Sequence, residues 1–398
     1  MSLSEDLAWR GLIKDKTFND TKWLDEPRTF YHGVDASSDS MTIGNLAAML
    51  LARRLIDAGW KAVLLAGGAT SLIGDPKDTE ERELKPREEV QKNVAAIKEQ
   101  INKLFAGKDF ALVDNYDWFA DVKYLDFLRD IGKNFAVSEL MQREFVNQRM
   151  DSGISYAEFS YSLIQGYDYL QLFKNHSTVL QIGGSDQWGN MLSGVSLIRK
   201  KESQEVQALS MPLVVNKATG VKFGKSEEGA IWLDPAKTTP EQFYQFWINT
   251  DDADVEDYLK VFTLLGQDEI EQIMKLQSED PAKRMAQVRL ADAVTILVHG
   301  QEGLNIAQEH RSRITGSADP SNGEHIKLAT GISVVDALVK TGLADSNSEA
   351  RRLLEDKGVY VNNQPYDKET LEAGDFEDGK LLLRKGKKLQ NSALVELE

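Results

Sequence analysis

Four segments of this 398-residue chain combine residue types and spacings that could bind a phosphorylated substrate. The first, YHGVDASSDSMTIGN at residues 31–45, has the pattern of a strand end, a loop and the first turn of a helix. Ligands bind outside the carboxyl ends of strands in open α/β sheets, and a helix N-terminus offers free N–H groups to phosphate. Gly33 and Gly44 would allow close backbone approach. The alternative is an ordinary β–α turn capped by Ser and Asp.

A glycine-rich turn and a polar helix face form the next two segments. LLAGGATSLIGDP at residues 64–76 follows a strand-like run, and its Asp75 could meet a ligand ammonium group, although a purely structural turn explains it as well. Tyr161, Gln165 and Asp168 are spaced i, i+4 and i+7, so they share one face of a predicted helix. That face is a hydrogen-bonding wall or, alternatively, a solvated surface. GGSDQWGN at residues 183–190 then gathers polar residues at a strand end, where a core strand would have no use for them.

The fourth segment, GVKFGKSEEG at residues 220–229, is not a P-loop. That motif requires four residues between its first glycine and Gly-Lys-Ser/Thr, whereas Gly220 and Gly224 enclose three. Lys222 and Lys225 could still clamp a polyphosphate, and an exposed turn is the alternative.

Hydrophobic periodicity predicts the elements that must position these residues. Short β-rich runs alternate with amphipathic helices from Arg28 to about Val215, which is typical of an open parallel α/β sheet of the Rossmann-like kind. Only helical patterns follow, up to about Arg313, and TGSADPSNGEH then resembles a linker. We predict an α/β domain at 1–230, an α-helical domain at 231–314, a linker at 315–328 and a small α+β module at 329–398.

Composition excludes several classes of protein. With no cysteine and five scattered histidines, the chain has no disulfide, no thiolate zinc site and no local metal motif. Its most apolar segment, LAAMLLA, ends at Arg53 and Arg54, too short to span a membrane, so we expect a cytoplasmic protein. The net charge of −16 argues against non-specific adhesion to nucleic acid, DNA included, but leaves room for local basic patches.

Together and in this order, the segments resemble the bacterial and mitochondrial tyrosyl-tRNA synthetases, which are class I aminoacyl-tRNA synthetases. The resemblance covers essentially the whole chain. It rests on YxGxD at residues 31–35, GGATxxIGDP at 67–76, YxxxQGYD at 161–168, GGSDQWGN at 183–190 and the KFGKS form of the class I lysine loop at 222–226. SEARRLLEDKGVYVN near the C-terminus resembles the small RNA-binding module of this family.

The resemblance implies a role for each candidate residue. In tyrosine binding it implies Tyr31 and Asp168 at the phenol, Asp75, Tyr161 and Gln165 at the ammonium group, and Gln187 near the reacting carboxyl group. In ATP binding it implies Gly33 and Asp35 near the α-phosphate, Gly184 and Asp186 at the ribose, and Gly44 in the first turn of the helix. The catalytic set comprises Ser37, Thr42, Asn45, Lys222, Lys225 and Ser226. Mg²⁺ would arrive with ATP rather than sit in a protein cage.

The family also implies partners: tRNA(Tyr), L-tyrosine, ATP and a second copy of the chain in a homodimer. For the RNA-binding module we expect local basic clusters, formed by Arg351 and Arg352 on its helix and by Lys380, Arg384, Lys385, Lys387 and Lys388 near its end.

One departure from the family leaves an alternative open. The HIGH motif reads Thr42, Ile43, Gly44 and Asn45 here, so the imidazole that would bond the γ-phosphate is missing. The leading interpretation is tyrosine–tRNA ligation. The alternatives are a synthetase-like RNA-binding protein that has lost adenylation, and a tyrosine or nucleotide sensor without RNA, which the basic C-terminal module disfavours.

Overall fold

The computed structural model divides the chain into two compact units, each of which is described by itself. One comprises residues 1–239 and 243–299, and the other comprises residues 240–242 and 300–398. The structure describes residues 1–75, 84–141, 146, 153–215, 225–226, 229–315, 326–344, 346–362, 364–376, 379–386 and 392–397.

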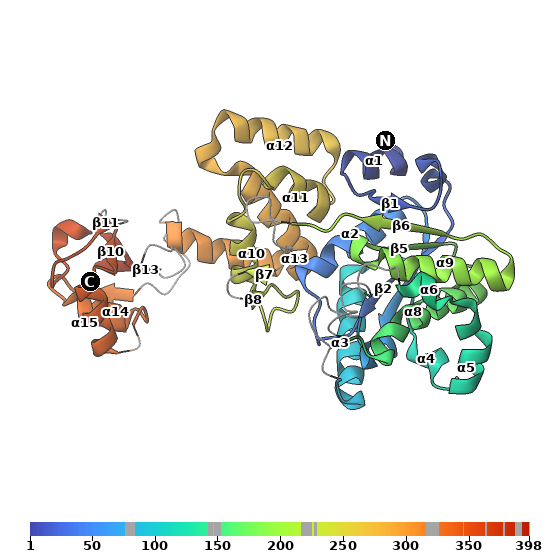
Figure 1. Cartoon of the computed structure of the whole chain (residues 1–398). Coiled ribbons are helices and arrows are strands. Elements are labelled where there is room, and N and C mark those ends of the chain that lie inside the picture. Colours follow the sequence, from blue (N-terminus) through green and yellow to red (C-terminus); the bar gives the residue numbers. More distant parts are fainter. Residues whose placement is uncertain are drawn as a thin grey trace. The chain divides into compact units, whose positions relative to one another are not determined.

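A six-stranded sheet forms the centre of the first unit (Figure 1). Its strands are β1 (Asp15–Lys16), β2 (Thr29–Asp35), β3 (Lys61–Gly67), β4 (Phe110–Asp114), β5 (Leu180–Gly184) and β6 (Gln207–Met211). Their order is β1-β6-β5-β2-β3-β4, and all neighbours are parallel except β1 with β6. β3 is buried over six of its seven residues because helices cover both faces of the sheet, as in other parallel sheets. The predicted Rossmann-like sheet is confirmed.

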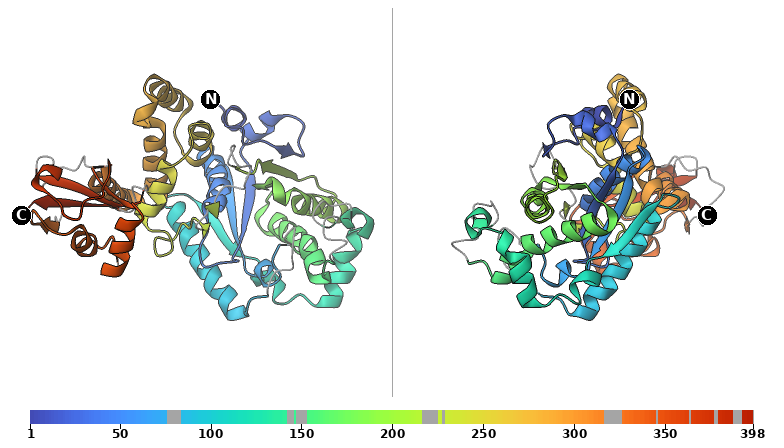
Figure 2. Two further views of the ribbon diagram at one scale, coloured as in Figure 1. Left: turned by 60° about the vertical axis from the view of Figure 1, so that its left-hand side comes forward. Right: turned by 90° about the vertical axis from the view of Figure 1, so that its right-hand side faces the viewer.

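Helices pack on the two faces of this sheet (Figure 2). α2 (Ile43–Asp57) and α3 (Arg87–Leu104) contact one face, and α8 (Tyr156–His176) and α9 (Trp188–Glu202) form the other layer over Tyr31, Val63 and Leu65. The shorter helices are α1 (Leu3–Trp9), α4 (Tyr116–Phe119), α5 (Tyr124–Asp130), α6 (Val137–Met141), η1 (Thr21–Asp25), η2 (Thr70–Leu72), η3 (Gly132–Asn134) and η4 (Ser185–Gln187).

The predicted helical segment follows a short hairpin of β7 (Lys225–Ser226) and β8 (Gly229–Ala230). It contains α10 (Pro240–Ile248), α11 (Val255–Phe262), α12 (Gln267–Glu279), η5 (Pro281–Lys283) and α13 (Met285–Thr315), and α13 is broken at Gly300. α11 is tied to α2 through Arg54, whose buried guanidinium donates to the carbonyl oxygens of Lys260 and Thr263. The predicted domain borders remain predictions.

The end of the second unit is an α+β module, as predicted. Its sheet has the order β11-β10-β12-β13-β9, and α14 (Val334–Lys340) and α15 (Asn347–Glu355) complete the core with it. The strands are β9 (Ile326–Leu328), β10 (Val359–Val361), β11 (Gln364–Pro365), β12 (Lys380–Lys385) and β13 (Ser392–Leu397), with η6 at Ala373–Asp375.

The structure corrects part of the expected basic surface of this module. Arg351 and Arg352 lie on α15, as predicted, and both are exposed. Arg384 is buried instead, because its guanidinium stacks over the Tyr360 ring at 5.2 Å within the sheet. Lys385 forms an ion pair with Glu349. Lys387 and Lys388 lie outside the described residues.

In the part of the chain that the structure describes, no helix is long and apolar enough to span a bilayer, and no group of three or more His, Cys, Asp or Glu side chains could hold a metal ion.

Candidate active site

A cavity of about 590 Å³ opens between β2 and β5, where the order of the strands in the sheet reverses. Strand β2 pairs with β3 along its whole length, but with β5 only at Phe30–Leu180 and Tyr31–Gln181. Beyond these pairs β2 and β5 separate, so their carboxyl ends border an open space. Such switch points are where open α/β sheets bind ligands.

The structure brings most of the predicted site residues to this cavity. Its lining includes Tyr31, Gly33, Asp35, Ser37, Thr42, Gly44, Asn45, Asp75, Tyr161, Gln165, Asp168, Gly184, Asp186 and Gln187. Lys222 lies outside the described residues. Lys225 and Ser226 are described only as backbone, in β7.

Tyr31 and Asp168 form a buried polar end of the cavity. The Tyr31 hydroxyl is buried, and no described atom bonds to it. Burial and the nearby Asp168 raise the pKa of Tyr31 well above its usual value, so this phenol is neutral. Asp168 accepts hydrogen bonds from Asn115 Nδ2 at 3.0 Å and from Trp118 Nε1 at 2.9 Å. A buried hydroxyl without a partner costs free energy, which a ligand that bonds to it would recover.

Burial raises the pKa of Asp168 to about 8, although the two hydrogen bonds lower it. An unfolded Asp ionises near pH 4, so the folded protein binds the extra proton between about pH 4 and 8. The free energy of unfolding should therefore fall as the pH rises through this window.

Replacing Asp168 by Asn removes this dependence. As the pH rises from 5.5 to 8, we expect the unsubstituted protein to lose about 1–3 kcal/mol of stability that Asp168→Asn does not lose. Denaturant unfolding at both pH values would measure the change. Parallel stability profiles would show that Asp168 is already ionised at pH 5.5.

Asp35 links the strand end to α8 and to the glycine-rich turn. Its two carboxylate oxygens accept hydrogen bonds from Tyr161 Oη at 2.7 Å and Thr70 Oγ1 at 2.6 Å. Asn115 donates to the same Thr70 hydroxyl at 3.1 Å, which connects this group to Asp168. A Cβ at Gly67 would lie 2.5 Å from Asp35 Oδ1, so that position requires glycine for packing.

A second polar cluster surrounds Asp75. Gln187 Nε2 donates to Asp75 Oδ2 at 2.7 Å, and Asn190 Nδ2 donates to Oδ1 at 3.1 Å. Ser162, on α8, in turn donates to Asn190 at 2.7 Å. These bonds hold the Asp75 carboxylate at the cavity wall, where it can attract a positively charged group.

The third part of the cavity is the start of α2. Asn45 Oδ1 accepts hydrogen bonds from the Thr42 backbone N–H at 2.9 Å and from the Thr42 hydroxyl at 3.1 Å. The one hydrogen of the Thr42 hydroxyl is therefore committed to Asn45. Ile43 N–H donates to Ile231 O at 3.1 Å, and the adjacent Ala230 pairs with Lys225, so the β7–β8 hairpin is anchored beside this helix start.

Sequence reasoning missed several polar residues at this site. Asn115 follows directly after β4, so the rule that ligands lie at strand ends could have found it. Thr70 and Asn190 lie within the segments at residues 64–76 and 183–190, and Trp118 lies in none of the four segments. The sequence could not show what these three side chains contact, because most of their partners are distant in the chain. His32, which also lines the cavity, contacts Ile182 O through Nδ1 at 3.1 Å, where backbone pairing of β2 and β5 has ended.

Comparison with known proteins identifies the family. Residues 24–314 match the model of the class I tRNA synthetases (W and Y), and residues 322–391 match the tyrosine–tRNA ligase SYY-like C-terminal domain. A tyrosine–tRNA ligase of Bacillus caldotenax is 44% identical, with 92% of each chain covered. The chain belongs to the tyrosine–tRNA ligase family.

Other relatives agree with membership of this ligase family. A tyrosine–tRNA ligase of Leifsonia xyli subsp. xyli is 42% identical, with 98% of this chain and 94% of that protein covered. The crystal structure of a C-terminally truncated mitochondrial tyrosyl-tRNA synthetase of Aspergillus nidulans superposes with a TM-score of 0.70 at 31% identity, covering 78% of this chain and 94% of that one. These relatives do not favour a protein that has lost adenylation.

Proposed function

We propose that this chain activates L-tyrosine with ATP to form tyrosyl-adenylate and pyrophosphate, and then transfers tyrosine to the 3′ end of tRNA(Tyr). The observation that carries this proposal is the unpartnered Tyr31 hydroxyl beside Asp168 at the buried end of the cavity. A ligand phenol would satisfy both groups. The Asp75 cluster on the same cavity supplies a carboxylate for an ammonium group.

The tyrosine roles follow from this arrangement. Tyr31 and Asp168 would bond the phenol, while Asp75, Tyr161 and Gln165 would hold the ammonium group. Gln187, which already donates to Asp75, would lie near the carboxyl group. The carboxylate of tyrosine attacks the α-phosphorus of ATP and displaces pyrophosphate, so no protein nucleophile is needed. Catalysis then depends on donors that bind the charge developing on the phosphates.

The opposite part of the cavity is proposed to hold ATP. Gly33 and the backbone of Asp35 would lie by the α-phosphate, and Gly184 and Asp186 by the ribose. The phosphate set would comprise Ser37, Thr42, Gly44, Asn45, Lys222, Lys225 and Ser226. Mg²⁺ would arrive bound to ATP and neutralise part of the phosphate charge. The cavity carboxylates Asp35, Asp75 and Asp168 already accept hydrogen bonds from protein donors, which is consistent with a metal ion that arrives bound to ATP.

Tyrosine-dependent exchange of pyrophosphate with ATP tests the first half-reaction. We expect exchange with tyrosine and far less with phenylalanine. A purified protein that binds tRNA but shows no exchange at saturating tyrosine and ATP would overturn the proposal in favour of the RNA-binding alternative.

The C-terminal module, residues 329–398, is proposed to serve tRNA and not adenylation. Ending the chain before Ile326 should leave pyrophosphate exchange nearly unchanged and lower kcat/KM for tRNA about tenfold, since exposed Arg351 and Arg352 can neutralise phosphates. Replacing both arginines by Ala should reduce the slope of log kcat/KM against log salt by roughly 1–2. Lys368→Ala is the control, because Glu372 already pairs with that lysine. Collapse of exchange in the truncated chain would contradict this division of labour.

A homodimer and a cytoplasmic location complete the proposal. Large apolar and aromatic side chains are exposed between α5 and the start of α8, with Leu125 at 75% and Tyr124 at 62% exposure. Val137 and Tyr156 are also exposed. Such a concentration on one segment is typical of a surface that a second copy covers.

A further inference from the structure

The loop between β2 and α2, residues 36–42, carries two cavity-lining residues, Ser37 and Thr42. Helix α3 holds both ends of this loop. Asn93 Nδ2 donates to Ala36 O at 3.0 Å, and Gln100 Oε1 accepts from Met41 N–H at 2.9 Å.

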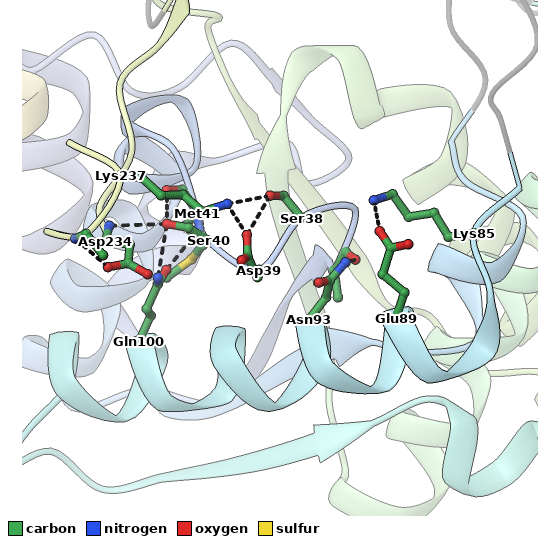
Figure 3. Close-up of polar contacts among 12 residues, drawn as sticks. Ser38, Asp39, Ser40, Met41, Lys85, Glu89, Asn93, Gln100, Asp234 and Lys237 are labelled. Carbon is green, nitrogen blue, oxygen red and sulfur yellow. Dashed lines mark hydrogen bonds and ion pairs between the residues drawn. The ribbon is translucent and has the colours of Figure 1, made fainter.

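The buried hydroxyl of Ser40 joins this loop to a distant part of the chain (Figure 3). It donates to Met41 O at 2.9 Å and accepts from Gln100 Nε2 at 3.0 Å and from Asp234 N–H at 3.2 Å. All of its hydrogen-bonding capacity is used, so a small shift of the 231–238 segment is resisted by both α3 and the loop.

The 231–238 segment also pairs with the start of α2. Leu233 N–H donates to Met41 O at 2.9 Å, and Trp232 forms an isolated antiparallel bridge with Thr42. Because β8 ends at Ala230, the hairpin that carries the Lys225 backbone leads directly into this bridge.

Lys237 links the 231–238 segment to the loop between β2 and α2 at the protein surface. Its ammonium group forms an ion pair with Asp39 and lies 3.4 Å from Ser38 Oγ (Figure 3). The same ammonium group lies 4.7 Å from the centre of the Trp232 ring. Lys237 does not line the cavity, and 31% of its side chain is exposed. A partly exposed pair contributes at most about 1 kcal/mol to stability, so a stabilising role alone does not explain three converging contacts.

We propose that Ser40, Gln100, Asp39 and Lys237 form a loop clamp that positions the phosphate end of the active site. The clamp fixes Ser37, Thr42 and the β7–β8 backbone relative to one another and contacts no substrate itself. This inference rests on the proposed adenylation activity. A misplacement of reacting groups by about 1 Å can cost on the order of 10²-fold in rate, so the clamp should act on turnover more than on stability.

Lys237→Met tests the clamp, and Lys108→Met is its matched control. Lys108 pairs with Asp57 at 2.6 Å, and its side chain has the same 31% exposure, but neither residue lines the cavity or touches the loop. We expect Lys237→Met to lower kcat for pyrophosphate exchange about tenfold and to raise KM for ATP. The tyrosine Kd should not change, and both variants should lose similar stability.

Three further variants make the test decisive. Asp39→Asn should reproduce the Lys237→Met defect, and the double variant should be no worse than either single one. Lys237→Arg should restore most of the rate, because it keeps the charge. If Lys237→Met exchanges like Lys108→Met, or weakens tyrosine binding as much as ATP binding, the clamp is not a positioning device. If the unsubstituted protein shows no exchange, it is the proposed function that fails.

Discussion

Thr42→His is expected to raise the rate of tyrosyl-adenylate formation about 10²-fold. Removing one preorganised donor to a developing oxyanion costs on the order of 10² to 10³ in rate. Thr42 cannot supply that donor in the present structure, because its hydroxyl hydrogen is directed to Asn45 Oδ1 at 3.1 Å. An imidazole at the same helix start would add an N–H donor next to the proposed phosphate position.

The measurement is the single-turnover rate of adenylate formation at saturating tyrosine and ATP. Tyrosine Kd should be nearly unchanged, since Tyr31, Asp168 and Asp75 lie elsewhere on the cavity wall. Loss of Thr42 as the N-cap of α2 should cost about 1 kcal/mol of stability, which a thermal unfolding curve would show. Thr42→Val controls for that cost, because it removes the hydroxyl without adding a donor.

The opposite result would also be informative. If Thr42→His lowers the rate, the Thr42–Asn45 pair is itself part of a phosphate site rebuilt around this sequence. If neither form makes adenylate while both bind tRNA, the RNA-binding alternative holds instead.

Asp168→Asn is expected to reduce the preference for tyrosine over phenylalanine about 10- to 10²-fold. Above about pH 8, where Asp168 is ionised, a hydrogen bond to this charged group contributes about 1.5–3 kcal/mol, and about 1.4 kcal/mol corresponds to a factor of ten. Sites that bond a substrate hydroxyl reject the analogue lacking it by about 10⁴ to 10⁵, a range for which tyrosyl-tRNA synthetases are themselves the established example. The ratio of kcat/KM for the two amino acids measures the change.

Two tyrosine variants separate recognition from packing. Tyr31→Phe removes the buried hydroxyl without a partner, so it should lower discrimination without lowering the stability of the free protein. Tyr169→Phe is the matched control: its ring lies 5.0 Å from that of Tyr31, but its hydroxyl donates to Gln207 O at 2.8 Å. It should cost stability and leave discrimination intact. Unchanged discrimination in both Asp168→Asn and Tyr31→Phe would remove this pair from the phenol site.

Local patterns in the sequence were sufficient for the fold class and for much of the cavity wall. Periodicity predicts the strands and helices, because hydrophobic spacing reflects which face of each element is buried. Tyr161, Gln165 and Asp168 lie on one face of α8, as their spacing requires, and all three line the cavity. Because ligands bind at the carboxyl ends of strands in open α/β sheets, the sequence also predicts that the segments at residues 31–45 and 183–190 lie at one edge of the sheet. For Lys222, and for the side chains of Lys225 and Ser226, the sequence pattern remains the only basis for a role.

Only the tertiary structure decided which groups support those residues, because such contacts join parts of the chain that no local period relates. Asn115 and Trp118 reach Asp168 from 53 and 50 residues away, and Lys237 reaches Asp39 across 198 residues. Strand pairing and helix packing determine which of these distant side chains come into contact. Long-range packing also explains why Arg384 is not part of the basic surface that the sequence predicted. Its strand, β12, lies between β10 and β13, and the Arg384 guanidinium stacks on the ring of Tyr360 in β10. The sequence therefore determined the elements and the chemistry available to them, and packing over long chain separations decided how that chemistry is held.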